Sequence, residues 1–304
     1  MNHNLKYLIE SVANNDLQKA KTFAKTIIDA DDTASNKYFV TNIKNKLNTP
    51  AMNLLELPSN IKGLLTVEDT SVSFNPNRYV LAGEDIETVN QILDTHKING
   101  RLTELGINYL NSSLLYGESG CGKTMLGRYI SWKSGLPFAY LNFSHLVSSY
   151  LGTTGKNIAA VFDFIANGKY VFMLDEIDAI GLKRGTEDVG EMSRIVITLM
   201  QSLDGLQNGT IVIGATNRED IIDPALKRRF TINHKMEFPS DKTIKCIVRR
   251  YIDTIPGAAA DYASIEKFAY DNSGKSCAAI VNLLIQRIVM CLTNNQPITL
   301  FDLK

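Results

Sequence analysis

A glycine-rich segment at residues 117–124, with the sequence GESGCGKT, limits what this 304-residue chain can fold into more than any other feature. An apolar run of strand length, residues 113–116, precedes it, and a helical pattern follows it. In that context the spacing G-x-x-x-x-G-K-[ST] predicts a loop whose backbone N–H groups surround phosphate at a helix N-terminus. The segment therefore predicts a nucleotide site at the end of a strand. Its residues are Gly117, Glu118, Ser119, Gly120, Cys121, Gly122, Lys123 and Thr124.

Short apolar runs alternate with longer helical stretches beyond residue 80. The runs lie at residues 113–116, 138–141, 171–174, 211–214 and 235–238. This alternation predicts an α/β fold of the P-loop NTPase kind, with a parallel five-stranded sheet and helices on both faces. After Pro239 the apolar stripes, such as that of Ile244, Ile247 and Val248, have helical spacing. We therefore expect a small all-helical C-terminal lid.

The first fifty residues carry three apolar stripes with helical spacing, separated by polar segments. They predict an N-terminal helical bundle. Two roles for this bundle are open. It could recognise a substrate or partner, or it could serve packing or oligomerisation, since helical apolar stripes form a core more often than a ligand groove. The predicted domains are the N-terminal bundle at residues 1–48, a linker at 49–65, a large nucleotide-binding domain at 66–239 and the lid at 240–304.

A second motif, VFMLDEID, places acids directly after a buried strand. The carboxyl ends of such strands face the ligand crevice of an open α/β sheet. Asp175 is expected to hold Mg²⁺ through its water shell together with the hydroxyl of Thr124, and Lys123 to pair with the β- and γ-phosphates. Glu176 is expected to act as the general base or to orient the attacking water. For Asp178, a catalytic role and a structural role at the next helix start are both open.

With these motifs the chain resembles the AAA ATPase family, over residues 66–295. The resemblance implies hydrolysis of ATP to ADP and phosphate, with ATP and Mg²⁺ as cofactors. The segment IGATNR resembles the family's sensor-one strand, in which Asn217 would orient the water and touch the γ-phosphate. The resemblance also implies nucleotide contacts at Gly83 and Gly274.

The segment DPALKRRF resembles the family's arginine-finger segment, in a compact form similar to that of the katanin, spastin and endosomal-sorting ATPases. By this resemblance Arg228 and Arg229 would reach the γ-phosphate bound to the next subunit and stabilise charge in the transition state. Because site and finger then lie on different subunits, a closed head-to-tail ring is implied, a hexamer by family resemblance.

The tripeptide Tyr150, Leu151 and Gly152 resembles the aromatic–hydrophobic–glycine pore loop of protein-threading AAA motors. An exposed aromatic side chain can wedge against any extended peptide, because the contact is mostly apolar area. Packing of Tyr150 on the edge of its own domain is the alternative.

Several positions depart from the family pattern. Glu118 and Ser119 stand where prolines are usual, and Cys121 stands where threonine is usual. Neither change removes an N–H donor, so phosphate binding is expected to survive. Two interpretations of Cys121 are open. Oxidation of its thiol would block the nucleotide site, or Cys121 is simply a small residue that fits in the loop.

Three further departures lie outside the phosphate loop. Ala159 stands where many relatives have an arginine, which would alter coupling between neighbouring subunits. In the lid, Cys277 and Ala279 replace the usual glycine and acid, which alters the expected contact with adenine.

Composition favours a soluble globular protein with no bias toward nucleic acid or membrane, since the formal net charge is +0 and the hydrophobic content is 44%. The N-terminus lacks a signal-peptide pattern, no apolar run reaches the length of a bilayer span, and the four cysteines show no paired metal spacing. A cytoplasmic location is therefore expected.

Two functions follow from these features. The leading hypothesis is a homo-oligomeric ring motor that engages and remodels or unfolds protein substrates. The alternative is an ATP-gated scaffold that assembles and releases a partner without threading. The sequence contains no H-E-x-x-H motif, so any proteolysis would belong to a separate partner protease. Balanced charge argues against a nucleic-acid partner.

Overall fold

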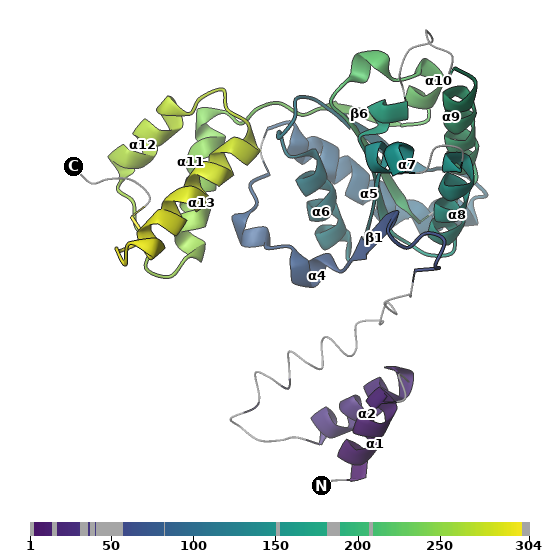
Figure 1. Ribbon diagram of the computed structural model, residues 1–304, viewed down its shortest axis with the longest axis horizontal. Coiled ribbons are helices and arrows are strands. Elements are labelled where there is room, and N and C mark those ends of the chain that lie inside the picture. Colours follow the sequence, from purple (N-terminus) through teal and green to yellow (C-terminus); the bar gives the residue numbers. More distant parts are fainter. Residues whose placement is uncertain are drawn as a thin grey trace. The chain divides into compact units, whose positions relative to one another are not determined.

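The computed structural model describes residues 3–13, 17–30, 36, 40, 57–81, 83–149, 153–180, 189–206 and 209–299. The chain divides into two compact units, residues 1–58 and residues 59–304. The first unit holds the two helices drawn in purple in Figure 1, and the second holds the sheet and the lid.

Two helices form most of the described part of the first unit, α1 (His3–Ala13) and α2 (Leu17–Asp29). The ring of Tyr7 on α1 stacks on the ring of Phe23 on α2 with a centroid distance of 5.2 Å. Two of the three expected N-terminal helices are therefore present. The third expected stripe, which includes Val40, lies almost entirely outside the described residues.

The second unit is built on a six-stranded sheet with the strand order β1-β3-β4-β5-β2-β6. The strands β2 to β6 run parallel, and β1 pairs antiparallel with β3 at one edge. The expected α/β class is confirmed, with one strand more than the five predicted. The strands are β1 (Leu65–Glu68), β2 (Asn111–Tyr116), β3 (Phe138–Asn142), β4 (Val171–Asp175), β5 (Ile211–Thr216) and β6 (Ile232–Lys235).

The two edge strands differ from the sequence prediction. Strand β1 has only four residues, too few for a period to be read, and it is held by its pairing with β3, as in Leu65 opposite Leu141. Strand β6 lies three residues earlier than the apolar run 235–238 predicts. The reason is its partner, since β2 ends at Tyr116 and the N–H of Met236 makes the last bond to it, at 2.7 Å.

Strand β4 shows why the central strands read as continuous apolar runs. The residues Val171, Phe172, Met173 and Leu174 all have no exposed surface. Val171 and Met173 belong to the core that α5 and α6 cover, whereas Phe172 packs edge-on against Phe162 of α8, with ring centroids 5.2 Å apart. A strand covered on both faces has no polar side to display.

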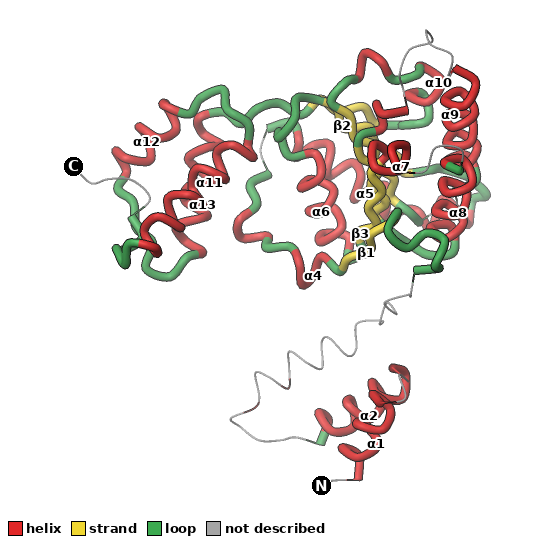
Figure 2. The backbone as a smooth tube through the Cα atoms, viewed as in Figure 1, coloured by secondary structure: helices red, strands yellow, loops and turns green. Residues whose placement is uncertain are grey.

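Helices cover the two faces of the sheet (Figure 2). One face carries α5 (Asp85–Glu104) and α6 (Lys123–Ser134), with the short α4 (Thr70–Ser73) beside α6. The other carries α7 (Phe143–Ser149), α8 (Thr154–Ala166) and α9 (Val189–Asp204). Short helical turns complete the domain, namely η2 (Pro76–Arg78), η3 (Ile177–Ile180), η4 (Glu219–Ile221) and α10 (Pro224–Lys227).

Between Pro239 and Thr299 the chain forms three helices, drawn in light green to yellow in Figure 1. They are α11 (Asp241–Thr254), α12 (Tyr262–Asp271) and α13 (Cys277–Thr293). Each begins after a residue whose side chain accepts a hydrogen bond from an N–H of the first turn, namely Ser240, Asp261 and Ser276. Their apolar stripes form a core of their own. Among the described residues, no helix combines the length and the apolar character that crossing a bilayer requires.

Candidate active site

The phosphate loop joins the end of β2 to the start of α6, and its path requires glycine. Gly117, Gly120 and Gly122 have φ angles of 144°, 79° and 111°, a region that L side chains rarely adopt. A Cβ atom on Gly117 would also lie 2.2 Å from the carbonyl oxygen of Met236. The loop therefore runs in direct backbone contact with the segment that follows β6.

The side chain of Lys123 lies inside this loop and is only 7% exposed. Its Nζ donates to the carbonyl oxygens of Gly117 at 2.8 Å and Glu118 at 3.0 Å, and to Oδ1 of Asn217 at 2.8 Å. Asn217 follows the carboxyl end of β5. The structure thus brings together two residues that the sequence analysis selected from different motifs.

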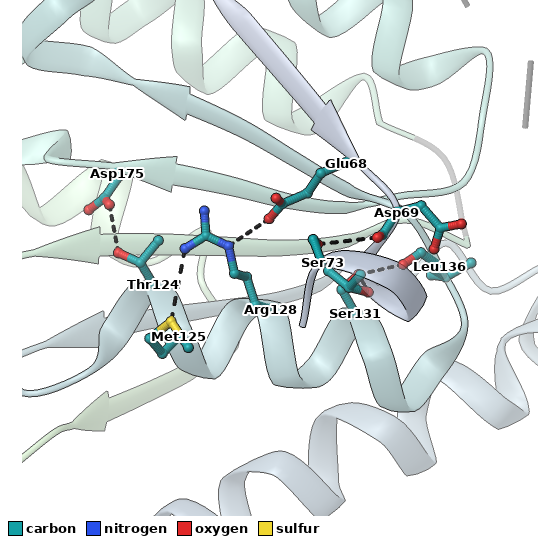
Figure 3. A network of polar contacts seen from close by, with 10 residues as sticks. Glu68, Asp69, Ser73, Thr124, Met125, Arg128, Ser131, Leu136 and Asp175 are labelled. Carbon is teal, nitrogen blue, oxygen red and sulfur yellow. Dashed lines mark hydrogen bonds and ion pairs between the residues drawn. The ribbon is translucent and has the colours of Figure 1, made fainter. Parts of the chain in front are cut away.

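Thr124 and Asp175 also meet, as Figure 3 shows. Oγ1 of Thr124 donates to Oδ2 of Asp175 at 2.9 Å, and the N–H of Glu176 donates to Oδ1 of Asp175 at 3.0 Å. A hydroxyl oxygen and a carboxylate oxygen are hard ligands of the kind that Mg²⁺ prefers, with water and phosphate oxygens completing its shell. The two residues predicted to hold the metal therefore suit that ion.

Tyr140 is a residue of this site that the sequence analysis did not select. It lies on β3, beside β4, and its hydroxyl donates to Oδ2 of Asp175 at 3.2 Å. Burial raises the pKa of Tyr140, and the charge of Asp175 raises it further, against a lowering by the hydrogen bond with Asn142. The phenol therefore stays protonated as a donor to the carboxylate. Its position in the strand next to the acidic motif is the signal that points to it.

Glu176 has a φ angle of 54°, an unusual conformation for a residue with a side chain. Such backbone strain concentrates at functional sites. Glu176 directly follows β4 and lines the cavity described below. Its placement suits the base or water-orienting role expected of it.

Asp178 takes part in a hydrogen bond between η3 and the end of β5. Oγ1 of Thr216 donates to Oδ1 of Asp178 at 2.7 Å, and the N–H of Arg218 donates to Oγ1 of Thr216 at 2.9 Å. These bonds tie η3 to the end of β5. Of the two roles left open for Asp178, the contacts favour the structural one.

A cavity of about 1040 Å³ extends from these groups to the lid. Its wall includes Lys123, Thr124, Asp175, Glu176 and Asn217, together with Gly83, Tyr79, Asp85 and the lid residues Tyr251, Cys277 and Val281. Gly83 thus lines the cavity, whereas Gly274 lies in the turn before α13 and is not among the described residues of the wall. Volume and lining suit a nucleotide with its phosphates on the loop.

The lid side of the cavity is partly buried. Burial is the main cause that raises the pKa of the Tyr79 hydroxyl, and it raises the pKa of the Cys277 thiol to about 11. Asp85 lies nearby, and its Oδ1 is 2.7 Å from Nε2 of His234. Neither Tyr79 nor the pair of Asp85 and His234 belongs to a recognisable motif, so the sequence analysis did not select them.

The side chains of the two arginines in the DPALKRRF segment have different surroundings. Nε and Nη2 of Arg229 donate to Oδ1 and Oδ2 of Asp204, each at 2.9 Å, and Nη1 donates to the carbonyl of Ala225 at 2.9 Å. Arg228, the exposed C-cap of α10, has a side chain without a hydrogen bond or ion pair to any residue that the structure describes. Neither arginine is part of the described cavity wall.

The remaining predicted site residues, Tyr150, Leu151 and Gly152, lie outside the described residues. The pore-loop assignment stays a prediction. Ala159 and Ala279, two of the departures from the family pattern, lie on α8 and α13 respectively.

A phosphate loop with an acidic metal site at the carboxyl end of the neighbouring strands defines a P-loop nucleotide-binding protein. Comparison with known proteins narrows this class. Residues 113–239 match the model of the family "ATPase family associated with various cellular activities (AAA)". Residues 113–239 are therefore an AAA-family ATPase domain, the kind of domain that uses ATP with Mg²⁺ and hydrolyses it.

Relatives of several kinds share this domain. An uncharacterized AAA family ATPase, y4kL, of Sinorhizobium fredii is 25% identical over 88% of this chain and 85% of its own length. A probable 26S proteasome regulatory subunit 6B of Caenorhabditis elegans is 33% identical over 60% of this chain and 46% of its own. An ATP-dependent zinc metalloprotease FtsH 1 of Thermoanaerobacter is 30% identical over 79% of this chain and 40% of its own. The chain thus spans less than half the length of the latter two.

Proposed function

We propose that this chain is the subunit of an ATP-driven ring that engages and remodels protein substrates. The observation that carries the proposal is the position of Arg228. The groups of the chain's own site are assembled, with Lys123 bonded to Asn217 and Thr124 bonded to Asp175. Arg228, by contrast, lies outside the described wall of that cavity, exposed and without a described side-chain partner. An arginine so placed is available to the nucleotide of a neighbouring copy.

The assembled groups support a division of roles in hydrolysis. Thr124 and Asp175 would hold Mg²⁺, which supplies charge neutralisation at the phosphates, and Lys123 would pair with the β- and γ-phosphates. Glu176 would take a proton from the attacking water or orient it, and Asn217 would fix its position. Arg228 of one subunit would stabilise the charge that develops on the phosphate bound to its neighbour.

The similarity to relatives supports the choice of protein as substrate class. Two of the relatives are named as a proteasome regulatory subunit and as an ATP-dependent metalloprotease, so ATPase domains of this kind occur in proteins of protein breakdown. On this proposal the ring is a homo-hexamer of the compact arginine-finger branch, Tyr150 is the pore aromatic, and any protease is a separate partner.

The test of assembly uses the variant Glu176→Gln, which should bind ATP without hydrolysing it and so accumulate the ATP-bound ring. Light scattering during size-exclusion chromatography should show a hexamer with ATP and smaller species without it. The double variant Glu176→Gln with Arg228→Ala should form less of the ring. A monomer under all conditions would contradict the proposal.

The test of remodelling uses Tyr150→Ala, scored by unfolding of a tagged protein substrate and by phosphate release in the same samples. Remodelling should be lost while most ATP turnover remains. Tyr270→Ala is the matched control, because Tyr270 is 79% exposed on the lid. Retention of substrate processing by Tyr150→Ala would reject threading and favour the ATP-gated scaffold.

A further inference from the structure

Two cysteines lie where the lid meets the phosphate loop. Cys121 is part of the loop, and Cys277 is the first residue of α13, directly after its N-cap Ser276. Both belong to the wall of the same cavity. Each also occupies a position at which the family pattern has another residue, threonine for Cys121 and glycine for Cys277.

A direct backbone contact holds the loop and the lid together at this point. The N–H of Ala278 donates to the carbonyl oxygen of Gly120 at 3.1 Å. A Cβ atom on Gly120 would lie 2.9 Å from Oγ of Ser276 and 3.2 Å from Cβ of Ala278. Cys121 and Cys277 are the chain neighbours of the two bonded residues. They therefore flank the same backbone hydrogen bond between loop and lid. A disulfide requires a Cα separation of about 4.4–6.8 Å, so its two cysteines must lie on chain segments that are in contact, as these two segments are.

The burial of the two thiols supports the same proximity. Cys121 is 4% exposed, and Cys277 is half-buried. Burial is the largest cause that raises the pKa of Cys277. The charge of Cys121 is the second cause, and the charge of Asp85 is the third. Such an effect falls off with distance, which agrees with the place of both thiols on the wall of one cavity.

The other two cysteines are placed differently. Cys246 lies on α11 and is half-buried. Cys291 is buried within α13, where its Sγ donates to the carbonyl oxygen of Thr299 at 3.6 Å. Neither belongs to the described wall of the cavity, which makes both suitable controls.

We propose that Cys121 and Cys277 are a modification site at which a peroxide-class oxidant closes a disulfide between the phosphate loop and the lid. One thiol reacts with hydrogen peroxide to give a sulfenic acid and one water. The second thiol attacks the sulfenic sulfur and releases a second water, so the two sulfurs lose two electrons and the peroxide is fully reduced. A thiol reductant reverses the bond by exchange.

The bond would act on the nucleotide site in two ways. It fixes the first turn of α13 to the loop, so the cavity between them can no longer open to exchange nucleotide. It also lies next to the phosphate-binding cation, since Nζ of Lys123 is 3.7 Å from Sγ of Cys121. The oxidised chain should therefore turn over ATP slowly, and recover when reduced.

The decisive measurement is peptide mapping of the full chain without reduction, after treatment with hydrogen peroxide. A linked peptide pair containing Cys121 and Cys277 is expected, within a single chain on a non-reducing gel. ATP hydrolysis should fall roughly tenfold, because release steps that depend on opening limit many such enzymes. Dithiothreitol should restore it. Saturating ATP during treatment should slow the linkage, because it fills the cavity.

Variants separate this bond from simple damage to the loop, each compared with its own reduced sample. Cys277→Ser and Cys277→Ala should lose the linked peptide and the dithiothreitol-reversible part of inhibition, whereas Cys246→Ser should behave as the unaltered chain. The proposal is wrong if peroxide gives no Cys121–Cys277 peptide in the unaltered chain, if the linkage joins two chains, or if Cys277→Ser keeps the full reversible inhibition. Peptide mapping decides the matter even if both Cys277 variants fold poorly, and it does not depend on ring assembly.

Discussion

Arg229 holds Asp204 of its own chain through two parallel hydrogen bonds, Nε to Oδ1 and Nη2 to Oδ2, each 2.9 Å long. This bidentate pair joins the segment after α10 to the end of α9. Neighbouring arginines that look equivalent in the sequence are therefore unequal in the structure. Arg229 fixes the position of the segment, and Arg228 is presented at its surface.

Substitution of the two arginines should separate these roles. Arg228→Ala should lower kcat for ATP by about three decades, the size of effect expected when a transition-state cation is lost, with little change in Tm. Arg229→Ala should lower Tm by a few degrees at most, because a partly exposed ion pair contributes only about 0.2–1 kcal/mol, and should reduce kcat less. Steady-state phosphate release and thermal unfolding measure both.

Asp204→Asn is the control for Arg229, since it weakens the same pair from the other side. Its effects should match those of Arg229→Ala and not those of Arg228→Ala. Equal losses of kcat in the two arginine variants would mean that Arg229 leaves Asp204 in the working assembly and acts beside Arg228.

Lys123 and Glu176 should differ in which step they affect. Glu176→Gln should keep nucleotide binding and lower kcat by about 10²–10⁴, the usual contribution of a general base. Lys123→Ala should instead abolish detectable binding, because Lys123 supplies the buried charge that the loop holds in place. Titration with a fluorescent ATP analogue, together with phosphate release, distinguishes the two. A Glu176→Gln variant that no longer binds ATP would place that residue in binding and not in chemistry.

The rate at which the thiol of Cys277 is alkylated should keep rising with pH beyond the range in which an ordinary thiol levels off. Because burial raises its pKa to about 11, little thiolate is present near neutral pH, and alkylation by iodoacetamide should rise about tenfold per pH unit from pH 7 to pH 10. Mass spectrometry of the Cys277 peptide gives the rate, and glutathione is the comparator, since an unperturbed thiol levels off above about pH 9. A plateau near pH 9 for Cys277 would contradict its burial beside the phosphate loop.

Gly117→Ala should lower the free energy of unfolding of the domain by more than the strained backbone conformation alone would. The new Cβ would meet the carbonyl oxygen of Met236 at 2.2 Å, at a φ of +144°. Gly135→Ala is the matched control, because Gly135 has a φ of +71° with no atom within 4 Å of the new Cβ. The control should cost about 1–2 kcal/mol from conformation, and Gly117→Ala about 1–3 kcal/mol more from overlap, in urea unfolding. Equal losses would show that the loop moves away from Met236 at little cost.

Much of the nucleotide site is predictable from the sequence because its groups are encoded locally. The loop of residues 117–124 and the acids at the end of β4 each occupy one continuous segment, and the topology of a parallel sheet then brings strand ends to one edge. The meeting of Thr124 with Asp175, and of Lys123 with Asn217, follows from that rule.

Other parts of the site are not predictable in this way, because they depend on pairs of residues far apart in the chain. Tyr140 reaches Asp175 only through the register of β3 against β4, and Asp85 meets His234 only through the packing of α5 against β6. The same holds for Arg229 and Asp204. Strand β1 is a related case, since four residues become a strand only when β3 is beside them.

The path of the chain from Arg229 to α11 has a mechanical consequence. Phe230 packs in the interior, β6 follows, Met236 lies against Gly117 of the phosphate loop, and Ser240 then starts the first lid helix. An extended strand is close to its maximum length per residue and can hardly stretch. The strand part of this segment can therefore hardly lengthen, so a displacement at the arginine end is passed along β6 toward the first lid helix.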